Sequence, residues 1–344
     1  MDNGDILVLK GNEIAKLLDG RELDLIDTVG RAYQAHANGA SSLPHSSFLH
    51  FPDNPRNRII ALPAYLGDEF GVAGIKWVAS FPSNIVMNLD RASATVILNS
   101  ADTGRPEAIL EGSIISAKRT AASAALAAQR LQDGRKKQRL GLFGCGLINF
   151  EIARFLVASS VEIESFFLFD VDEARIAQFK SKCVKVFPDI PVETTTDSTA
   201  LYESCSLISF ATTSIKPHVS DLSKCPPGST ILHISLRDLT AEVILSCDNI
   251  VDDIDHVCRA QTSVHLAEQL VGNRDFIRCN LAEILQGTAP ARDGAKVAVF
   301  SPFGLGILDL AVAKLVRDLA LEQGTGITIE SFLPDSWADK AGVL

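Results

Sequence analysis

Three cationic residues in the first 120 positions have the chemical types that an acid–base or carboxylate-binding site needs. Lys76 lies within an apolar run, Gly74-Ile-Lys-Trp-Val78. A buried lysine is costly unless it is paired or used, and burial lowers its pKa toward the range that suits proton transfer. Arg119 and Arg58 are candidate carboxylate ligands, because a guanidinium can donate two parallel hydrogen bonds to a carboxylate. The alternatives are a solvent-facing edge-strand lysine at position 76 and a surface salt bridge at Arg58.

A glycine-rich turn, Gly144-Cys-Gly-Leu-Ile-Asn149, follows an apolar stretch and precedes an expected helix. Gly144 allows a tight turn, and Gly146 lets the backbone approach a pyrophosphate at the helix N-terminus. Asn149 stands where the usual pattern has its third glycine, which weakens the motif taken alone. We expect this turn to bind a dinucleotide through Gly144, Gly146, Leu147 and Ile148.

The next apolar stretch supplies the context that the glycine motif lacks, because it ends in an acidic residue, Asp170. A carboxylate at this point can bind the adenosine ribose hydroxyls and repels a 2′-phosphate, so the sequence favours NAD over NADP. Thr212 and Ser235 follow later strands, where doubly wound sheets bind ligands, although such hydroxyls are also common helix caps. The alternative is a Rossmann-like domain that holds no cofactor.

Composition and motif content exclude several other classes of protein. The formal net charge is −10 and the basic residues are scattered, which argues against nucleic acid as the main partner. The seven cysteines form no CxxC pair, which indicates reduced thiols rather than a disulfide framework. No HxH or HExxH pattern predicts a metal site, and His233 fits a hydrogen-bonded core residue better. Without a signal sequence or an apolar run of membrane length, we expect a cytoplasmic protein with no membrane contact.

From residue 139 onward, short apolar runs alternate with amphipathic stretches. Strands that alternate with helices predict a parallel sheet with helices on both faces. The expected strands are 140–143, 165–169, 207–210, 230–234, 249–251 and 297–300. This half of the chain is therefore predicted to form a Rossmann NAD-binding domain of the α/β class, built on a doubly wound parallel sheet.

The first part of the chain predicts a mixed αβ domain instead. Its expected strands cover residues 5–10, 58–63 and 72–79, with a hairpin at 94–99 and 107–110, and its expected helices cover 24–38 and 113–131. A last long helix at 308–323 and a strand at 327–332 are expected to return to this domain. We therefore expect residues 1–118 with 308–344 to form a substrate-binding and dimerisation domain, and residues 119–307 to form the NAD-binding domain.

Taken together, these motifs resemble the ornithine cyclodeaminase/mu-crystallin family. The matching stretches run in order through nearly the whole chain: Gly74-Ile-Lys76, Ser116-Ala-Lys-Arg-Thr-Ala-Ala122, Gly144-Cys-Gly146, and Ser301-Pro-Phe-Gly-Leu-Gly306 followed by Asp309. The resemblance implies that Lys76 and Arg119 lie at the substrate. It also implies a homodimer built through the first domain.

One branch of the family is the most similar. Arg58-Ile-Ile-Ala-Leu-Pro63, Gly74-Ile-Lys-Trp77 and Asp90-Arg-Ala-Ser93 resemble the branch that makes 2,3-diaminopropionate for siderophore or related natural-product biosynthesis. Such enzymes oxidise N-(2-amino-2-carboxyethyl)-L-glutamate with NAD and hydrolyse the imine to 2-oxoglutarate and L-2,3-diaminopropionate. Where true cyclodeaminases have a glycine-rich aspartate loop, this chain has Ile234-Ser-Leu-Arg-Asp-Leu-Thr240, without the Gly-Gly or Pro-Gly of that loop, which argues against cyclisation. Asp238 in this loop is a candidate to activate water, or else caps the following helix.

Our hypothesis for the mechanism is that Arg119 and Arg58 hold substrate carboxylates. Lys76 then acts as the acid–base group for water addition and C–N cleavage. Three alternative functions fit the same motifs. They are an ornithine cyclodeaminase, a ketimine reductase or amino-acid dehydrogenase, and a non-enzymatic binding protein.

Overall fold

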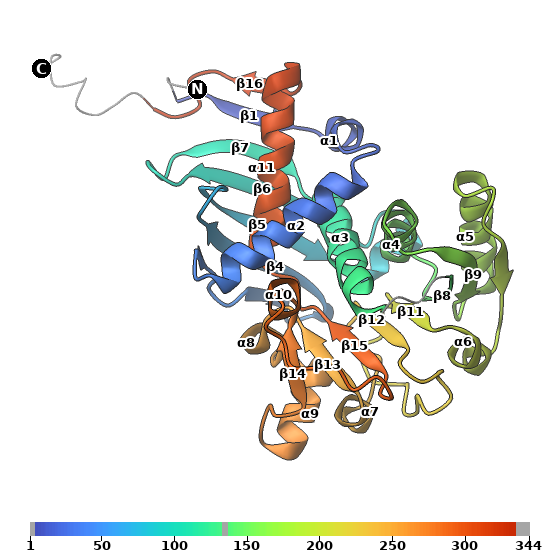
Figure 1. Ribbon diagram of the computed structural model, residues 1–344. Helices are drawn as coiled ribbons and strands as arrows, with labels where there is room; N and C mark the ends of the chain where they lie inside the picture. The colour runs from blue at the N-terminus through green and yellow to red at the C-terminus, as the bar shows by residue number, and fades with distance from the viewer. Residues whose placement is uncertain (1–3, 133–136, 335–344) are drawn as a thin grey trace, which may run out of the picture. The chain divides into compact units, whose positions relative to one another are not determined.

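The computed structural model describes residues 4–132 and 137–334, which fall into two compact units (Figure 1). The first unit lies within residues 1–21, 38–119 and 306–344, and the second within residues 22–37 and 120–305. The expected domains differ from these units mainly in one helix, α2 (Glu22–Ala37), which groups with the second unit. Its Tyr33 hydroxyl lies 2.7 Å from Oγ of Ser123 in a buried contact. The ends of the expected first domain, 1–3 and 335–344, lie outside the described residues.

The first unit is built on a mixed sheet with the strand order β16-β1-β7-β6-β5-β4-β2, in which β3 also pairs with β4. Only β1 and β7 run parallel; every other pairing is antiparallel. The strands are β1 (Ile6–Leu9), β2 (Ser41–Ser42), β3 (Ser47–Phe51), β4 (Asn54–Leu66), β5 (Val72–Ser80), β6 (Ala92–Ser100), β7 (Pro106–Glu111) and β16 (Ile327–Ile329). The helices are α1 (Gly11–Leu17), the 3-10 helix η1 (Pro82–Met87) and α11 (Gly306–Gln323).

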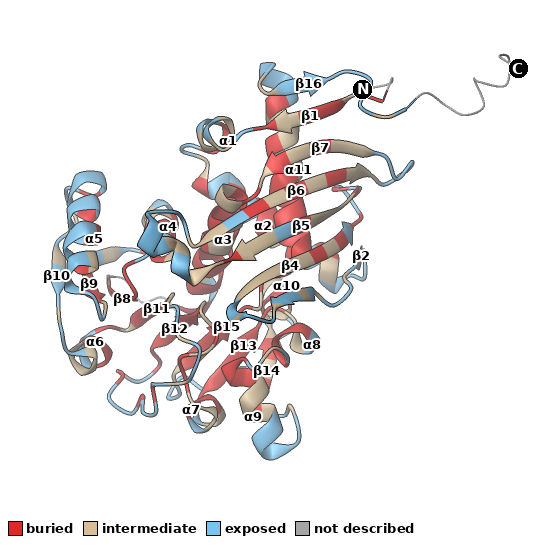
Figure 2. Cartoon of the chain, turned by 180° about the vertical axis from the view of Figure 1, so that it is seen from behind, coloured by how far each residue is buried: buried red, intermediate tan, exposed pale blue. Residues whose placement is uncertain are grey.

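Alternating burial along β4 to β7 separates the two faces of this sheet (Figure 2). Side chains of alternate residues point to opposite faces, so Leu62, Lys76 and Val96, which are partners across three strands, share one face. This face is buried, and α11 packs against β4, β5 and β6 (Figure 1). The sheet therefore places Lys76 in a covered layer rather than at the surface.

The second unit is built on a parallel sheet with the strand order β10-β9-β8-β11-β12-β15-β13-β14. The strands are β8 (Gln138–Phe143), β9 (Ile163–Phe169), β10 (Val192–Thr194), β11 (Leu207–Phe210), β12 (Thr230–His233), β13 (Asp248–Val251), β14 (Ile277–Asn280) and β15 (Ala298–Ser301). The helices are α2, α4 (Leu147–Ala158), α5 (Glu173–Val186), α6 (Ser198–Ser204), α7 (Ala241–Ser246), α8 (Ile254–Val257), α9 (Ser263–Val271) and α10 (Leu281–Gln286). The boundary between the units falls within α3 (Ser113–Leu131).

The strand order reverses between β8 and β11, because β8 pairs with β9 on one side and β11 on the other. Such a reversal leaves room beyond the carboxyl ends of the two strands, where doubly wound sheets bind their ligands. All six strands expected from the apolar runs are present, which confirms the α/β fold class. The short strands β10 and β14 were not expected, since their three and four residues, VET and IRCN, carry little apolar signal.

The described residues also bear on the classes that composition excluded. All seven cysteines are buried and free of disulfides. In residues 4–132 and 137–334, no helix has both the length and the apolar character needed to span a bilayer. In the same residues there is no cluster of three or more His, Cys, Asp or Glu side chains that could hold a metal ion.

Candidate active site and cofactor-binding residues

The side chain of Lys76 is held in a buried ion-pair cluster within the first unit. Lys76 lies in β5 with only 3% of its surface exposed, between β4 and β6, so it is not an edge-strand lysine. Its Nζ donates to Oδ2 of Asp309 in α11 at 2.7 Å and to Oγ of Ser116 in α3 at 3.2 Å. Nε of Arg119, also in α3, donates to the other oxygen of Asp309 at 3.0 Å. Three elements distant in sequence thus meet at one carboxylate.

The charges in this cluster do not cancel. Burial, and after it the charge of Arg119, lowers the pKa of the Lys76 amine to about 8, even though Asp309 acts in the opposite direction. Burial also acts on Asp309, where it favours the neutral acid, but Arg119 and Lys76 hold the pKa of this carboxyl below its ordinary value. Asp309 is therefore ionised at neutral pH. With Lys76 protonated, two cations share one anion, and a carboxylate ligand would neutralise the excess charge.

Arg58 lies on the same sheet face as Lys76, farther along the strands. It is a half-buried residue of β4, opposite Ser80 in β5. Its buried Nε has no hydrogen-bond partner, and burial lowers the pKa of its guanidinium. No carboxylate among the described residues forms an ion pair with it. The surface salt bridge considered for Arg58 is therefore not found.

In the second unit, the two glycines of the turn after β8 have different structural roles. Gly144 has φ +97, and a Cβ at this position would lie 2.6 Å from the carbonyl oxygen of Ala211, at the end of β11. Only glycine fits so close an approach of the two loops. A Cβ added at Gly146 would have no atom within 4 Å, so the outer side of the turn is open at this residue. This open backbone is the surface on which a pyrophosphate could lie.

The first turn of α4 presents unpaired donors at that surface. Gly146 is the N-cap residue and no side chain caps this helix end, which leaves the first amides of the helix, including those of Leu147 and Ile148, available to an anion. Asp170 follows β9. Its carboxylate accepts hydrogen bonds from the backbone amides of Cys145 at 2.7 Å and Asp172 at 3.0 Å. An ionised carboxylate has about four acceptor positions, so it retains capacity for ribose hydroxyls.

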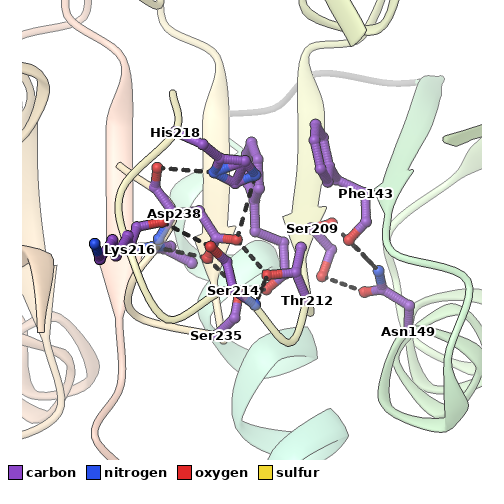
Figure 3. A network of polar contacts seen from close by, with 11 residues as sticks. Phe143, Asn149, Ser209, Thr212, Ser214, Lys216, His218, Ser235 and Asp238 are labelled. Atoms are coloured by element: carbon purple, nitrogen blue, oxygen red, sulfur yellow. Dashed lines mark hydrogen bonds and ion pairs between the residues drawn. The ribbon is translucent and has the colours of Figure 1, made fainter. Parts of the chain in front are cut away.

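Asn149 stabilises this glycine turn. Its side chain is fully buried, and Nδ2 donates to the carbonyl oxygens of Phe143 at 3.0 Å and Gly144 at 2.7 Å. Its Oδ1 accepts from Oγ of Ser209 in β11 at 2.7 Å (Figure 3). Asn149 thus ties the turn to the neighbouring strand. The residue that weakens the sequence motif fixes the loop in the structure.

Thr212 and Ser235 both direct their hydroxyl groups at Asp238 (Figure 3). Asp238 is fully buried, and Nε2 of His233 lies 3.3 Å from its Oδ2. Burial acts to raise the pKa of Asp238, but hydrogen bonds with His233, Ser235 and Thr212 hold it below its usual value. An ionised carboxylate therefore orients two hydroxyls that follow neighbouring strands, β11 and β12.

One alternative for Asp238 is wrong: it does not cap the helix that follows. The N-cap residue of α7 is Thr240, whose side chain accepts from the amide of Val243. The expectation for His233 is confirmed, because it is buried and its Nδ1 lies 3.1 Å from Oγ of Ser301. The contact with Ser301 joins β12 to β15.

Sequence comparison places the whole of this architecture in one family. Residues 7–324 match the ornithine cyclodeaminase/mu-crystallin family. The chain belongs to this family. The membership expected from the motifs is thereby confirmed.

Three known proteins are similar to this chain over their full length. One is the N-((2S)-2-amino-2-carboxyethyl)-L-glutamate dehydrogenase of Staphylococcus aureus, with 27% identity over 96% of this chain and 100% of that protein. The structure of Thermococcus litoralis Delta(1)-pyrroline-2-carboxylate reductase, in complex with NADH and L-proline, has a TM-score of 0.86, with 25% identity over 94% of this chain and 100% of that chain. An archaeal alanine dehydrogenase dimer with bound NAD has a TM-score of 0.83, with 26% identity over 95% of this chain and 100% of that chain.

Within each unit, the structure brings together some of the site residues that the sequence predicted. Lys76 meets Arg119 through Asp309, while Arg58 lies farther along the same sheet face. Asp309 was part of a matching motif without an assigned role. A lone acid at the start of an apolar helix resembles an ordinary first-turn residue, so nothing local marks it as a partner of Lys76. Ser116 was likewise part of a matching stretch without an assigned role.

Proposed function

We propose that this chain oxidises N-(2-amino-2-carboxyethyl)-L-glutamate with NAD and water, and releases 2-oxoglutarate, L-2,3-diaminopropionate and NADH. At the coarser level, the chain is an NAD-dependent oxidoreductase that acts on the C–N bond of a small amino-acid-like substrate. The observation that carries the proposal is the buried excess of positive charge at Lys76, Arg119 and Asp309. The staphylococcal dehydrogenase, similar over 96% of this chain, supports the choice of substrate.

The residues of the second unit fit the cofactor. The turn at Gly144 and Gly146, with Leu147 and Ile148, would hold the pyrophosphate, and Asp170 would accept the ribose hydroxyls. The hydroxyls of Thr212 and Ser235 would line the same edge of the sheet. When bound, NAD supplies the acceptor for the hydride that leaves the substrate Cα. The carboxylate of Asp170 disfavours a 2′-phosphate, which supports NAD over NADP.

The residues of the first unit bind the substrate and move its protons. Arg119 keeps its terminal nitrogens available, because only its Nε is used by Asp309, and it holds one substrate carboxylate. Arg58 holds another. Lys76 contacts the substrate and, with a pKa of about 8, can be a neutral amine that accepts a proton from the water adding to the imine. It then returns a proton to the departing nitrogen as the C–N bond breaks.

Asp238 has a less direct role in this proposal. Its oxygens are buried and engaged by the Thr212 and Ser235 hydroxyls. It can therefore activate water only through one of these hydroxyls, as a relay. An Asp238→Asn variant that keeps NAD affinity but loses imine hydrolysis would support this role, and one with unchanged hydrolysis would remove it.

We also propose a homodimer that forms through the first unit. The face of the sheet opposite Lys76 carries exposed apolar side chains, with Tyr65, Trp77 and Leu49 exposed by 40%, 44% and 48%. An apolar face of this kind on a sheet is typical of protein–protein contacts. The archaeal alanine dehydrogenase relative is a dimer. A Trp77→Arg substitution should shift the protein to monomer in sedimentation equilibrium, and an unchanged mass would contradict this interface.

One assay tests the proposed reaction directly. The purified protein is incubated with the conjugate and NAD, NADH is followed by absorbance, and both products are quantified by mass spectrometry. We expect one 2-oxoglutarate and one 2,3-diaminopropionate per NADH. Consumption of ornithine without net NADH would instead identify a cyclodeaminase. Activity confined to alanine or to a cyclic ketimine would identify an amino-acid dehydrogenase or ketimine reductase, the reading that the pyrroline-2-carboxylate reductase relative favours.

A further inference from the structure

A second group of cations lies on the buried face of the first sheet, beyond the Lys76 cluster. Arg91, which directly precedes β6, donates from Nη1 to Oγ of Ser80 at 2.8 Å. Ser80 is 8% exposed and lies opposite Arg58 in the register of β4 and β5. Ser80 therefore binds Arg91 through its hydroxyl and is the strand-register partner of Arg58, which brings the two arginines to one end of the same sheet face. We call Arg58, Ser80 and Arg91 the distal cluster.

Nothing in the described part of the chain neutralises the distal cluster. Neither Arg58 nor Arg91 has an ion-pair partner there, and the buried Nε of Arg58 has no hydrogen bond. Burial lowers the pKa of the Arg91 guanidinium, and the nearby charge of Arg58 lowers it further. Two like-charged guanidinium groups in a partly desolvated environment destabilise the folded protein unless an anion binds between them.

The spacing between the distal cluster and Lys76 follows from the strand. Lys76 and Ser80 are four residues apart in β5 and point to the same face. Their Cα atoms are therefore separated by about 13 Å along the strand. A small polycarboxylate that is held at its two ends by long cationic side chains can span a separation of this size. A monocarboxylic amino acid cannot occupy both places.

We propose that Arg91, with Arg58 and the Ser80 hydroxyl, forms a second carboxylate subsite that selects substrates with a distal carboxylate. This inference rests on the proposed function, since it assigns a carboxylate at one end of the substrate to the Lys76 cluster and another to the distal cluster. N-(2-amino-2-carboxyethyl)-L-glutamate has three carboxylates and can fill both subsites. Alanine, proline and ornithine each have one, so Arg91 is a specificity-determining residue.

The first test is kinetic and uses Arg91→Gln, with Arg91→Lys as the conservative variant. Loss of a charge-assisted hydrogen bond should raise KM for the conjugate by about tenfold to a hundredfold, with kcat nearly unchanged. The lysine variant should restore part of the affinity. Arg105→Gln is the matched control, because Arg105 is exposed in the loop between β6 and β7 and its loss removes the same charge from the same unit. An Arg91→Gln enzyme with the KM of the wild type would overturn the subsite.

The second test measures binding without turnover. 2-Oxoglutarate and 2-oxobutyrate differ only in the distal carboxylate, and calorimetry gives their Kd values for each full-length variant. Wild type and Arg105→Gln should prefer 2-oxoglutarate by about tenfold or more, and Arg91→Gln should lose this preference. A wild type without the preference, or an Arg91→Gln variant that keeps it, would overturn the subsite. If the wild type shows the preference but does not oxidise the conjugate, the subsite stands and the proposed reaction fails.

Discussion

Nζ of Lys76 lies 2.7 Å from Oδ2 of Asp309, although 233 positions separate the two residues in the chain. The two groups are buried by 97% and 100% of their side-chain surface, and Arg119 engages the second oxygen of the same carboxylate. Removing one member of such a group leaves an uncompensated buried charge, which is far more costly than removing a surface ion pair. The cluster therefore constrains the position of α11, and the function proposed above also assigns it the binding of an anionic substrate.

Lys76→Ala should abolish NADH formation while NAD binding remains. The loss of a positioned acid–base group costs about 10²–10⁴-fold in rate, and loss of the substrate contact adds to this. Rates are measured by NADH absorbance, and NAD affinity by titration of protein fluorescence. Lys10→Ala, which removes an exposed lysine from the same unit, is the control and should behave as wild type. Full turnover by Lys76→Ala would remove Lys76 from the mechanism.

The pH dependence of kcat/KM should report the Lys76 amine. If the neutral amine is the active form, kcat/KM for oxidation rises with pH and levels off above about 8. Asp309 raises the pKa of Lys76, so Asp309→Asn should move the rising limb to lower pH. The profile is measured with both proteins at saturating NAD. If the rising limb of the kcat/KM profile lies at the same pH in Asp309→Asn as in the wild type, the titrating group is not Lys76.

Alanine at Gly144 should lower the stability of the protein, whereas alanine at Gly146 should weaken NAD binding without changing the stability. Gly144→Ala places a Cβ 2.6 Å from the Ala211 carbonyl oxygen at φ +97, so it should lower the free energy of unfolding by about 1–3 kcal/mol or more. Gly146→Ala meets no atom and has an ordinary φ of −111, so it should unfold like wild type yet bind NAD more weakly. Urea unfolding and NAD titration separate the two effects. Equal stability of both variants would contradict the assigned roles.

Asp170→Asn should weaken the preference for NAD over NADP by about tenfold or more, the equivalent of 1.4 kcal/mol. The single amide oxygen can still accept the hydrogen bond from Cys145 N, although the one from Asp172 N is lost, so the glycine turn stays anchored while the charge that repels a 2′-phosphate is removed. The ratio of kcat/KM for the two cofactors is the measurement, and circular dichroism checks the fold. An unchanged ratio would show that Asp170 does not determine the choice of cofactor.

Much of the second unit could be predicted because its signals are local. Continuous apolar runs such as residues 207–210 mark buried parallel strands, and the order of glycines and Asp170 along the chain fits one well-defined turn. Lys76 could be singled out because a charge within an apolar strand is rare and costly. The position of α2 could not be predicted, since its apolar face fits either unit and only its contacts with α4 and α10 decide between them.

The sequence by itself determined the fold class, the family and the identity of the groups that can do chemistry, because each depends on residue type, spacing and periodicity. Only the tertiary structure decided which charges meet. Asp309 reaches Lys76, and Arg91 reaches Ser80 opposite Arg58, because strand register and helix packing bring them within hydrogen-bond distance. Electrostatic energies fall steeply with distance and rise with burial, and neither quantity can be read from positions along a chain.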